Sequence, residues 1–173
     1  MTIETARLCI VPFGDEHLTA RYVCWLKDPK VVRHSELRHR PQTLEGSRAY
    51  RESMQRGGHF FWALMAKDGR HIGNMTAIID RPNRVADLSI MIGERNVWGQ
   101  GYGSEAWDAA CRYLLESAGM RKVRAGTMAV NQAMRALMRK SEMEPDGVWR
   151  RHLLFEGQEV DVVFAALFAE RNA

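Results

Sequence analysis

The sequence is poor in cysteine and shows no spacing typical of metal ligands. Its three cysteines, Cys9, Cys24 and Cys111, are scattered along the 173 residues and form no C-x-x-C pair. An odd, dispersed set of this kind excludes a disulfide framework and indicates reduced thiols. The histidines are scattered as well, so we expect no metal site.

A second absence is that of any long apolar run. No stretch approaches the length that a membrane-spanning helix needs. The opening residues MTIETARLCI do not contain the basic segment followed by an apolar one that marks a signal peptide. We therefore expect a cytoplasmic protein without a membrane partner.

Positive charge exceeds negative charge, yet no nucleic-acid-binding motif accompanies the excess. The formal net charge is +4, with 25 Lys and Arg against 21 Asp and Glu. Much of the excess lies in short clusters, such as residues 33–40 and 121–124. A solvated surface accounts for such clusters, so we expect no nucleic acid partner and keep a basic nucleic-acid-binding domain as a weaker alternative.

The length and the order of elements indicate a single domain of the α/β class over residues 1–173. Alternation and helical spacing predict a strand, two helices, three strands, a helix, a strand, a helix and two strands. The expected strands cover residues 5–13, 60–66, 71–79, 86–93, 122–130, 148–155 and 159–168. The expected helices begin at Asp15, Thr43, Gly103 and Asn131. This order predicts a mixed α+β sheet flanked by helices.

The most informative segment is Gly99-Gln100-Gly101-Tyr102-Gly103-Ser104, between an expected strand and an expected helix. Glycine lets the backbone turn sharply and approach a ligand closely. Successive N–H groups at a helix N-terminus then form a concavity that binds phosphate. One glycine would suffice for an ordinary turn, so three at alternate positions favour a phosphate site. The unit of strand, loop, helix and strand predicts a βαβ crossover between parallel strands.

Two other phosphate-binding motifs fit the sequence less well. A Walker loop requires Gly-Lys-Ser/Thr, which does not occur in the chain. The dinucleotide fingerprint is formally matched by Gly101-x-Gly103-x-x-Ala106, but it also needs an acidic residue about 20 positions later. Residues 121–130 contain no acid, and several strands precede the loop, so a nicotinamide cofactor is disfavoured.

The loop, the strand before it and a later segment resemble the GNAT N-acetyltransferases. The matching pieces are residues 87–93, residues 98–106, Asn131-x5-Leu137-x-x-Lys140, Ala6-Arg7-Leu8 and Trp25-Leu26-x-Asp28-Pro29. The similarity covers nearly the whole chain and is strongest to the branch of ribosomal-protein N-terminal, spermidine and amino-sugar acetyltransferases. It implies a central, mostly antiparallel sheet with a parallel βαβ crossover at the cofactor loop and helices on both faces.

The resemblance implies acetyl-CoA as the co-substrate. The residues it assigns to coenzyme A binding are Met91, Ile92, Trp98, Gly99, Gln100, Gly101, Tyr102, Gly103, Ser104, Asn131 and Lys140. The loop amides would bind the phosphates, and the backbone of Met91 and Ile92 would pair with the pantetheine arm. Trp98 departs from the Gln or Arg of the family's loop pattern, which backbone binding tolerates. Asn131 could equally be a plain helix cap, and Lys140 a solvated side chain.

The resemblance also implies direct attack of a primary amine on the thioester within a ternary complex. Asp87 is the candidate general base, with a surface residue of a half-exposed strand as the alternative. The family's frequent general acid, a tyrosine, is replaced by Met138, and a serine of some members by Met134. Ser141 and Tyr102 are the remaining hydroxyl candidates, so no general acid is assigned. A non-catalytic coenzyme A-binding sensor of the same fold is therefore an alternative.

The acceptor is expected over the segment that follows Pro29. Its candidate binding residues are Arg33, Glu36 and Arg38, with a solvated loop as the alternative. The arginines suit the phosphates of an amino sugar attached to a nucleotide, whereas Glu36 suits a cationic amine. We predict a small-molecule amine, an amino sugar first, and keep a peptide N-terminus or a polyamine as alternatives. The chain could also form a homodimer.

Overall fold

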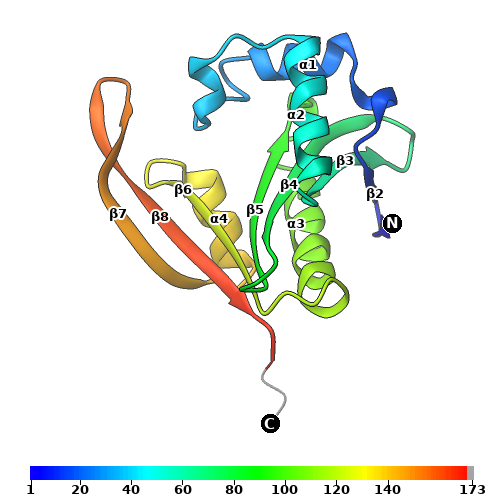
Figure 1. Cartoon of the computed structure of the whole chain (residues 1–173). Coiled ribbons are helices and arrows are strands. Elements are labelled where there is room, and N and C mark those ends of the chain that lie inside the picture. The colour runs from blue at the N-terminus through cyan, green and yellow to red at the C-terminus, as the bar shows by residue number, and fades with distance from the viewer. Residues whose placement is uncertain (171–173) are drawn as a thin grey trace.

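Eight strands form one mixed sheet in the computed structural model, which describes residues 1–170 (Figure 1). The strands are β1 (Ile3–Glu4), β2 (Leu8–Pro12), β3 (Phe60–Ala66), β4 (His71–Asp80), β5 (Val85–Ile92), β6 (Lys122–Met128), β7 (Glu144–Phe155) and β8 (Gln158–Phe168). Their order across the sheet is β1-β2-β3-β4-β5-β6-β8-β7, and every neighbouring pair is antiparallel except β5–β6. The sequence prediction of a mostly antiparallel sheet with one parallel crossover is confirmed.

Helices cover both faces of this sheet, as predicted. The α-helices of the described residues are α1 (Ala20–Lys27), α2 (Leu44–Arg56), α3 (Tyr102–Arg112) and α4 (Gln132–Lys140). Short 3₁₀ turns occupy Asp15–His17, Glu36–His39 and Arg95–Val97, and a π-helical turn, Tyr113–Ser117, continues α3. Residues of α1 and α2 pack in one hydrophobic cluster, and residues of α3 and α4 pack in another on the opposite face.

Two helices begin at the residues that the sequence predicts. The hydroxyl oxygen of Thr43 accepts a hydrogen bond from the N–H of Gly46 at 3.0 Å and caps α2. The side-chain oxygen of Asn131 accepts one from the N–H of Met134 at 3.2 Å and caps α4. Each cap satisfies a backbone donor that the first turn of a helix leaves free.

The first helix begins later than predicted. Thr19 caps α1, because its hydroxyl oxygen accepts a hydrogen bond from the N–H of Tyr22 at 3.1 Å. Asp15, the predicted cap, instead begins a separate 3₁₀ turn, and its carboxylate pairs with Arg48 of α2 at 2.6 Å. The prediction for Asp15 was wrong because two cap-forming residues lie four positions apart and the ion pair engages the first of them.

Two other predicted boundaries also differ. The strand expected at residues 5–13 begins only at Leu8, as β2, and the two-residue strand β1, which the sequence did not predict, precedes it. The chain turns between them, where the Thr5 hydroxyl accepts a hydrogen bond from the N–H of Leu8 at 2.9 Å. The helix expected to reach Ala118 changes at Tyr113 to a π-helical turn, in which the N–H of Ala118 donates to the Tyr113 carbonyl at 2.9 Å.

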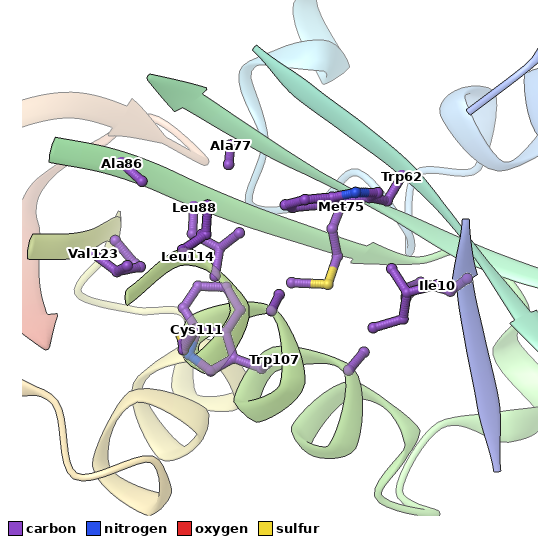
Figure 2. Close-up of a cluster of buried hydrophobic side chains, with 14 of the residues drawn as sticks. Ile10, Trp62, Met75, Ala77, Ala86, Leu88, Trp107, Cys111, Leu114 and Val123 are labelled. Atoms are coloured by element: carbon purple, nitrogen blue, oxygen red, sulfur yellow. The ribbon is translucent and has the colours of Figure 1, made fainter. Parts of the chain in front are cut away.

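The larger hydrophobic cluster fixes α3 against the sheet. Trp107 of α3 and Leu114 of the turn that follows it are fully buried and lie toward Met75 and Leu88 on the sheet (Figure 2). Burying each side chain of this size contributes about 2 kcal/mol. The cluster therefore holds the glycine loop, which leads directly into α3, at a fixed place beside β5.

Strands β5 and β6 separate soon after they pair. Only residues 85–87 of β5 pair with residues 122–124 of β6. Beyond that point β5 continues to Ile92 beside β4, and β6 continues to Met128 beside β8. The sheet therefore opens between the two strands, and residues 88–92 have no strand partner on that side.

Candidate active site

A cleft of about 1520 Å³ lies where the sheet opens. Its walls come from α1, the segment of residues 29–43 (the acceptor segment), α2, β4, β5, the glycine loop, α4 and the end of β7. The volume exceeds the roughly 300–1,000 Å³ of most small-molecule sites. It is large enough for two substrates to lie together.

The structure brings most of the predicted site residues to this cleft. Those that line it are Met91, Ile92, Trp98, Gly99, Gly101, Tyr102, Gly103, Ser104, Asn131, Lys140 and Arg33. Four predicted site residues lie outside its lining, namely Asp87, Gln100, Glu36 and Arg38. The chemical roles assigned to all of them stay predictions.

The glycine loop presents the N-terminus of α3 to the cleft. Gly99 and Gly101 have φ values of +75° and +84°, in the left-handed region that favours glycine. Gly101 is the N-cap residue of α3, and no side chain caps the helix there. The first N–H groups of α3 therefore lack a side-chain acceptor, and Gly103 and Ser104 of that turn line the cleft. Such amides, at the positive end of the helix dipole, favour an anion.

Trp98 closes the end of β5 beside the loop. Its indole N–H donates to the Ile92 carbonyl at 2.9 Å, although the side chain is 43% exposed. The Ile92 carbonyl thus already has a donor. An extended ligand that pairs with the open edge of β5 would therefore use the other peptide groups of residues 88–92.

Asn131 and Lys140 line the wall that α4 contributes. Both ends of the Asn131 amide are engaged, because its oxygen caps α4 and its nitrogen donates to the Thr127 hydroxyl at 3.0 Å. The helix-cap interpretation of Asn131 is confirmed. Among residues 1–170 no carboxylate forms an ion pair with Lys140, so its charge is available to a ligand in the cleft.

Asp87 lies on β5 but forms an ion pair outside the cleft. Its carboxylate accepts hydrogen bonds from Arg124 of β6, with Nη2 at 2.8 Å and Nε at 2.9 Å. Ser89 lies two positions further along the same face of β5 and does line the cleft. Asp87 thus holds the two strands together at the point where they begin to separate, and its role as a base stays a prediction.

The acceptor segment is held by the tip of the β7–β8 hairpin, residues 154–157. Arg33 forms an ion pair with Glu156 at 2.9 Å. Arg38 donates to the Leu154 carbonyl at 3.0 Å and pairs with Glu36 at 2.9 Å. Figure 1 shows this hairpin extending away from the rest of the sheet. The guanidinium of Arg38 is therefore occupied in holding the hairpin tip.

His34 lies between these contacts, stacked on Phe155, and both residues line the cleft. Burial lowers the pKa of the His34 imidazole, and the charges of Arg33 and Arg38 lower it further, against a smaller opposing effect of Glu156. The imidazole is therefore neutral near pH 7 and has a free lone pair.

The charged side chains that line the cleft are all cationic among residues 1–170. They are Lys30, Arg33, Arg40 and Lys140, and no aspartate or glutamate lines it. Neither Lys30 nor Arg40 forms an ion pair within the described part of the chain. The cleft therefore favours a ligand that carries negative charge.

Sequence reasoning missed the polar floor of the cleft. Asn74 and Thr76 of β4 lie opposite Met91 and Ser89 of β5, and both line the cleft with Tyr50 of α2. The side-chain oxygen of Asn74 is buried and has no hydrogen-bond partner in the part of the chain that the structure describes. Polar residues at alternate positions of an otherwise apolar strand, as in Gly73-Asn74-Met75-Thr76-Ala77, were the signal that could have identified this floor.

The hydroxyl candidates for a general acid are separated by the structure. Tyr102 lines the cleft. Ser141 does not, and its hydroxyl donates to Asp108 at 2.5 Å. Met138 is buried, whereas Met134 lines the cleft and offers no proton. Of the two hydroxyl residues considered from the sequence, only Tyr102 lines the cleft.

Two further kinds of feature are absent from residues 1–170. No helix there is both long enough and apolar enough to cross a membrane. No group of three or more His, Cys, Asp or Glu side chains in the same residues has the proximity needed to hold a metal ion.

Comparison with protein families and solved structures identifies relatives of this fold. Residues 7–144 match the model of the acetyltransferase (GNAT) domain. No curated protein matches the sequence. A RimL ribosomal L7/L12 alpha-N-protein acetyltransferase in complex with coenzyme A superimposes with a TM-score of 0.85 at 18% identity, over 98% of this chain and 98% of that chain.

Two other solved structures share the fold at similarly low identity. Spermidine N-acetyltransferase from Vibrio cholerae, in complex with coenzyme A and spermine, has a TM-score of 0.84 at 14% identity, over 95% of this chain and 96% of that chain. A GNAT-family acetyltransferase from Bacillus anthracis has a TM-score of 0.82 at 16% identity, over 97% of this chain and 98% of that chain.

Proposed function

The chain belongs to the GNAT acetyltransferase family, and we propose that it transfers the acetyl group of acetyl-CoA to a primary amine within the cleft. The observation that carries the proposal is the glycine loop. It presents the uncapped N-terminus of α3 to a cleft that opens between two separating strands. The N-terminus of α3 suits a diphosphate, and the open edge of β5 suits an extended amide chain. Coenzyme A carries both groups.

The reaction requires few groups from the protein. A neutral amine attacks the thioester carbonyl carbon, the C–S bond breaks, and coenzyme A leaves as a thiolate. The proton that the amine nitrogen loses passes to a base, and the thiolate takes a proton from Tyr102 or from water. We expect the polar floor formed by Asn74, Thr76 and Ser89 to orient the amine, because its N–H groups need acceptors there.

Two residues are candidates for the base. Asp87, the candidate from the sequence, is engaged by Arg124 and lies outside the cleft lining. His34 lines the cleft, and its imidazole is neutral because burial and two nearby arginines lower its pKa. We therefore place His34 first as the proton acceptor, directly or through water, and keep Asp87 as the alternative.

The acceptor we propose is an amine that also carries an anionic group, with a nucleotide-linked amino sugar as the first choice. Lys30, Arg40 and Arg33 lie at the acceptor end, and no carboxylate of residues 1–170 lines the cleft. A polycation such as spermidine would find no partner for its charges. The peptide N-terminus acceptor of the RimL structure is the second choice.

An acetylation assay with matched amines tests this proposal. We expect the nucleotide-linked amino sugar to exceed a neutral peptide amine and spermidine in kcat/KM. Arg40→Ala should remove most of this preference, whereas Arg48→Ala, on the outer side of α2 and paired with Asp15, should leave it unchanged. Faster acetylation of spermidine by the wild type would overturn the acceptor assignment.

The donor is tested separately by calorimetry. Coenzyme A should bind and NAD should not, because the strand after α3 lacks the acidic residue of a dinucleotide site. Binding of coenzyme A without turnover of any amine would favour a non-catalytic sensor over an enzyme.

A further inference from the structure

Arg7 joins the N-terminal strands to the glycine loop. Its Nε donates to Glu105 Oε2 at 2.6 Å, and its backbone N–H donates to Oε1 of the same carboxylate at 2.7 Å. Its Nη1 donates to the Gln100 carbonyl at 2.8 Å. The guanidinium also lies 4.3 Å from the centre of the Tyr102 ring. Every one of these partners belongs to the loop or to the first turn of α3.

Arg7 acts from behind the loop. Gly101 and Tyr102 line the cleft, whereas Arg7 and Gln100 do not. The Gln100 carbonyl is held toward Arg7, and in a trans peptide the N–H of the next residue points the opposite way. The contact therefore directs the N–H of Gly101 away from Arg7, toward the cleft that Gly101 lines.

The same guanidinium compensates an unfavourable charge. Glu105 lies in the first turn of α3, where its carboxylate would repel an anion bound at the helix N-terminus. Although burial alone would raise the pKa of Glu105, hydrogen bonds from Thr5 and Arg7 lower it, so the group is ionised near pH 7. The ion pair with Arg7 neutralises this charge without removing the hydrogen bonds that hold α3.

We propose that Arg7 is a positioning residue for the diphosphate of the acetyl donor, acting through the Gln100–Gly101 peptide group and through Glu105. This inference rests on the proposed function. A loop with three glycines loses much conformational freedom when it is ordered, and a fixed carbonyl reduces that loss before the ligand arrives. The effect of Arg7 should therefore appear on the phosphates of the donor and not on its acyl-pantetheine part.

The experiment compares two donors, acetyl-CoA and S-acetyl-pantetheine, which lacks the phosphates. We expect Arg7→Ala to lower kcat/KM for acetyl-CoA by about 10-fold or more, as loss of charge-assisted hydrogen bonds implies. For S-acetyl-pantetheine the change should stay below about twofold. The calorimetric Kd of coenzyme A should rise in step with the first effect.

Matched variants separate positioning from stability. Lys67→Ala removes the ion pair that joins β1, through Glu4, to the β3–β4 turn and does not touch the loop, so it should leave kcat/KM for both donors unchanged. Arg7→Lys keeps the charge but cannot contact Glu105 and Gln100 together, so it should fall between wild type and Arg7→Ala. The double variant Arg7→Ala/Glu105→Gln no longer carries the unpaired carboxylate. Its affinity for coenzyme A should therefore lie above that of Arg7→Ala and below that of the wild type.

Three results would contradict the proposal or its premise. An equal loss for both donors, or a lower Tm with an unchanged Kd for coenzyme A, would show that Arg7 is merely structural. If Arg7→Ala fails to fold, Arg7→Lys is measured with the same two donors, and an equal loss for both would again contradict the proposal. Absence of coenzyme A binding in the wild type would overturn the proposed function itself, and with it the role of Arg7.

Discussion

The imidazole of His34 stacks on the ring of Phe155, with the centroids 5.3 Å apart and the planes inclined by 23°. His34 belongs to the acceptor segment and Phe155 to the end of β7, and the described part of the acceptor segment does not pair with β7 as a strand. The contact therefore fixes the acceptor end of the cleft through side chains. Such a contact can be altered without disturbing the sheet.

Replacing Phe155 should affect the acceptor and not the donor. In Phe155→Ala the imidazole loses its stacking partner, so we expect the KM of the amine to rise by about 5- to 10-fold. The KM of acetyl-CoA should stay unchanged in steady-state assays. Leu154→Ala is the control, because that side chain is 65% exposed and the carbonyl that accepts from Arg38 is retained.

The pH dependence of kcat/KM tests the assignment of the base. Because the pKa of His34 is lowered, the imidazole is the neutral, proton-accepting form at pH 7, and activity should fall as the pH decreases through that pKa. His34→Gln should lower kcat by about 10²-fold and abolish this acidic limb. The exposed His39 lies outside the cleft lining, so His39→Gln should keep the limb.

Asp87→Asn is measured in the same series. If Asp87 only holds β5 to β6 through Arg124, this variant and Arg124→Gln should have the same modest effects on Tm, and the acidic limb should persist. Loss of the limb in Asp87→Asn, with its retention in His34→Gln, would assign the base to Asp87 instead.

Replacing Gly101 should reduce both the stability of the protein and its affinity for coenzyme A. A side chain at φ +84° is strained, and its Cβ would lie 3.3 Å from Arg7 Nη2. Gly101→Ala should therefore cost about 1 kcal/mol in stability and weaken coenzyme A binding by about 10-fold or more. Gly69→Ala has the same φ in the β3–β4 turn with nothing nearby, so it should lose stability but bind coenzyme A normally.

His71 should make the protein less stable at acidic pH. Burial lowers its pKa from 6.5 to about 4, with a smaller contribution from the nearby His17. Folding therefore favours the neutral imidazole. The resulting contribution to stability, about 3 kcal/mol, is complete above pH 6.5 and is lost as the pH falls toward 4. Urea unfolding from pH 7.5 to 5 should show this loss in the wild type.

A variant isolates the contribution of His71. His71→Gln should flatten the pH dependence of the free energy of unfolding over the same range, although its stability at pH 7.5 should also be lower because the ring packs 4.9 Å from Trp25. An unchanged slope in His71→Gln would transfer the effect to His17, whose pKa burial also lowers.

Local patterns in the sequence predict most of the elements and the position of the glycine loop at the start of α3. Caps such as Thr43 and Asn131, and a glycine at every second position from 99 to 103, act within a few residues, and the structure agrees with them. Asp15 shows the limit of such patterns. Its capping role was lost to Thr19, because an ion pair with α2 engages it.

The acceptor end could not be predicted in the same way, because contacts distant in the sequence determine it. Arg33 and Arg38 form a positive cluster in the sequence. In the structure Arg33 pairs with Glu156 and Arg38 donates to the Leu154 carbonyl, so both side chains hold the hairpin tip. The sequence points to Arg7 only as part of a short N-terminal match. Its partners Gln100 and Glu105 are nearly 100 positions away, and no local pattern indicates them.

The pairing of the acceptor segment with the hairpin tip also constrains how this enzyme could change its substrate. The elements proposed to bind the donor occupy a continuous stretch from β5 to α4, whereas those proposed to bind the acceptor come from two segments more than 100 residues apart. A substitution of residues 29–43 alone would leave Glu156 and the Leu154 carbonyl without their partners. Transplanting acceptor specificity from a relative should therefore succeed only when residues 29–43 and 154–157 are exchanged together, an exchange that should leave binding of the acetyl donor unchanged.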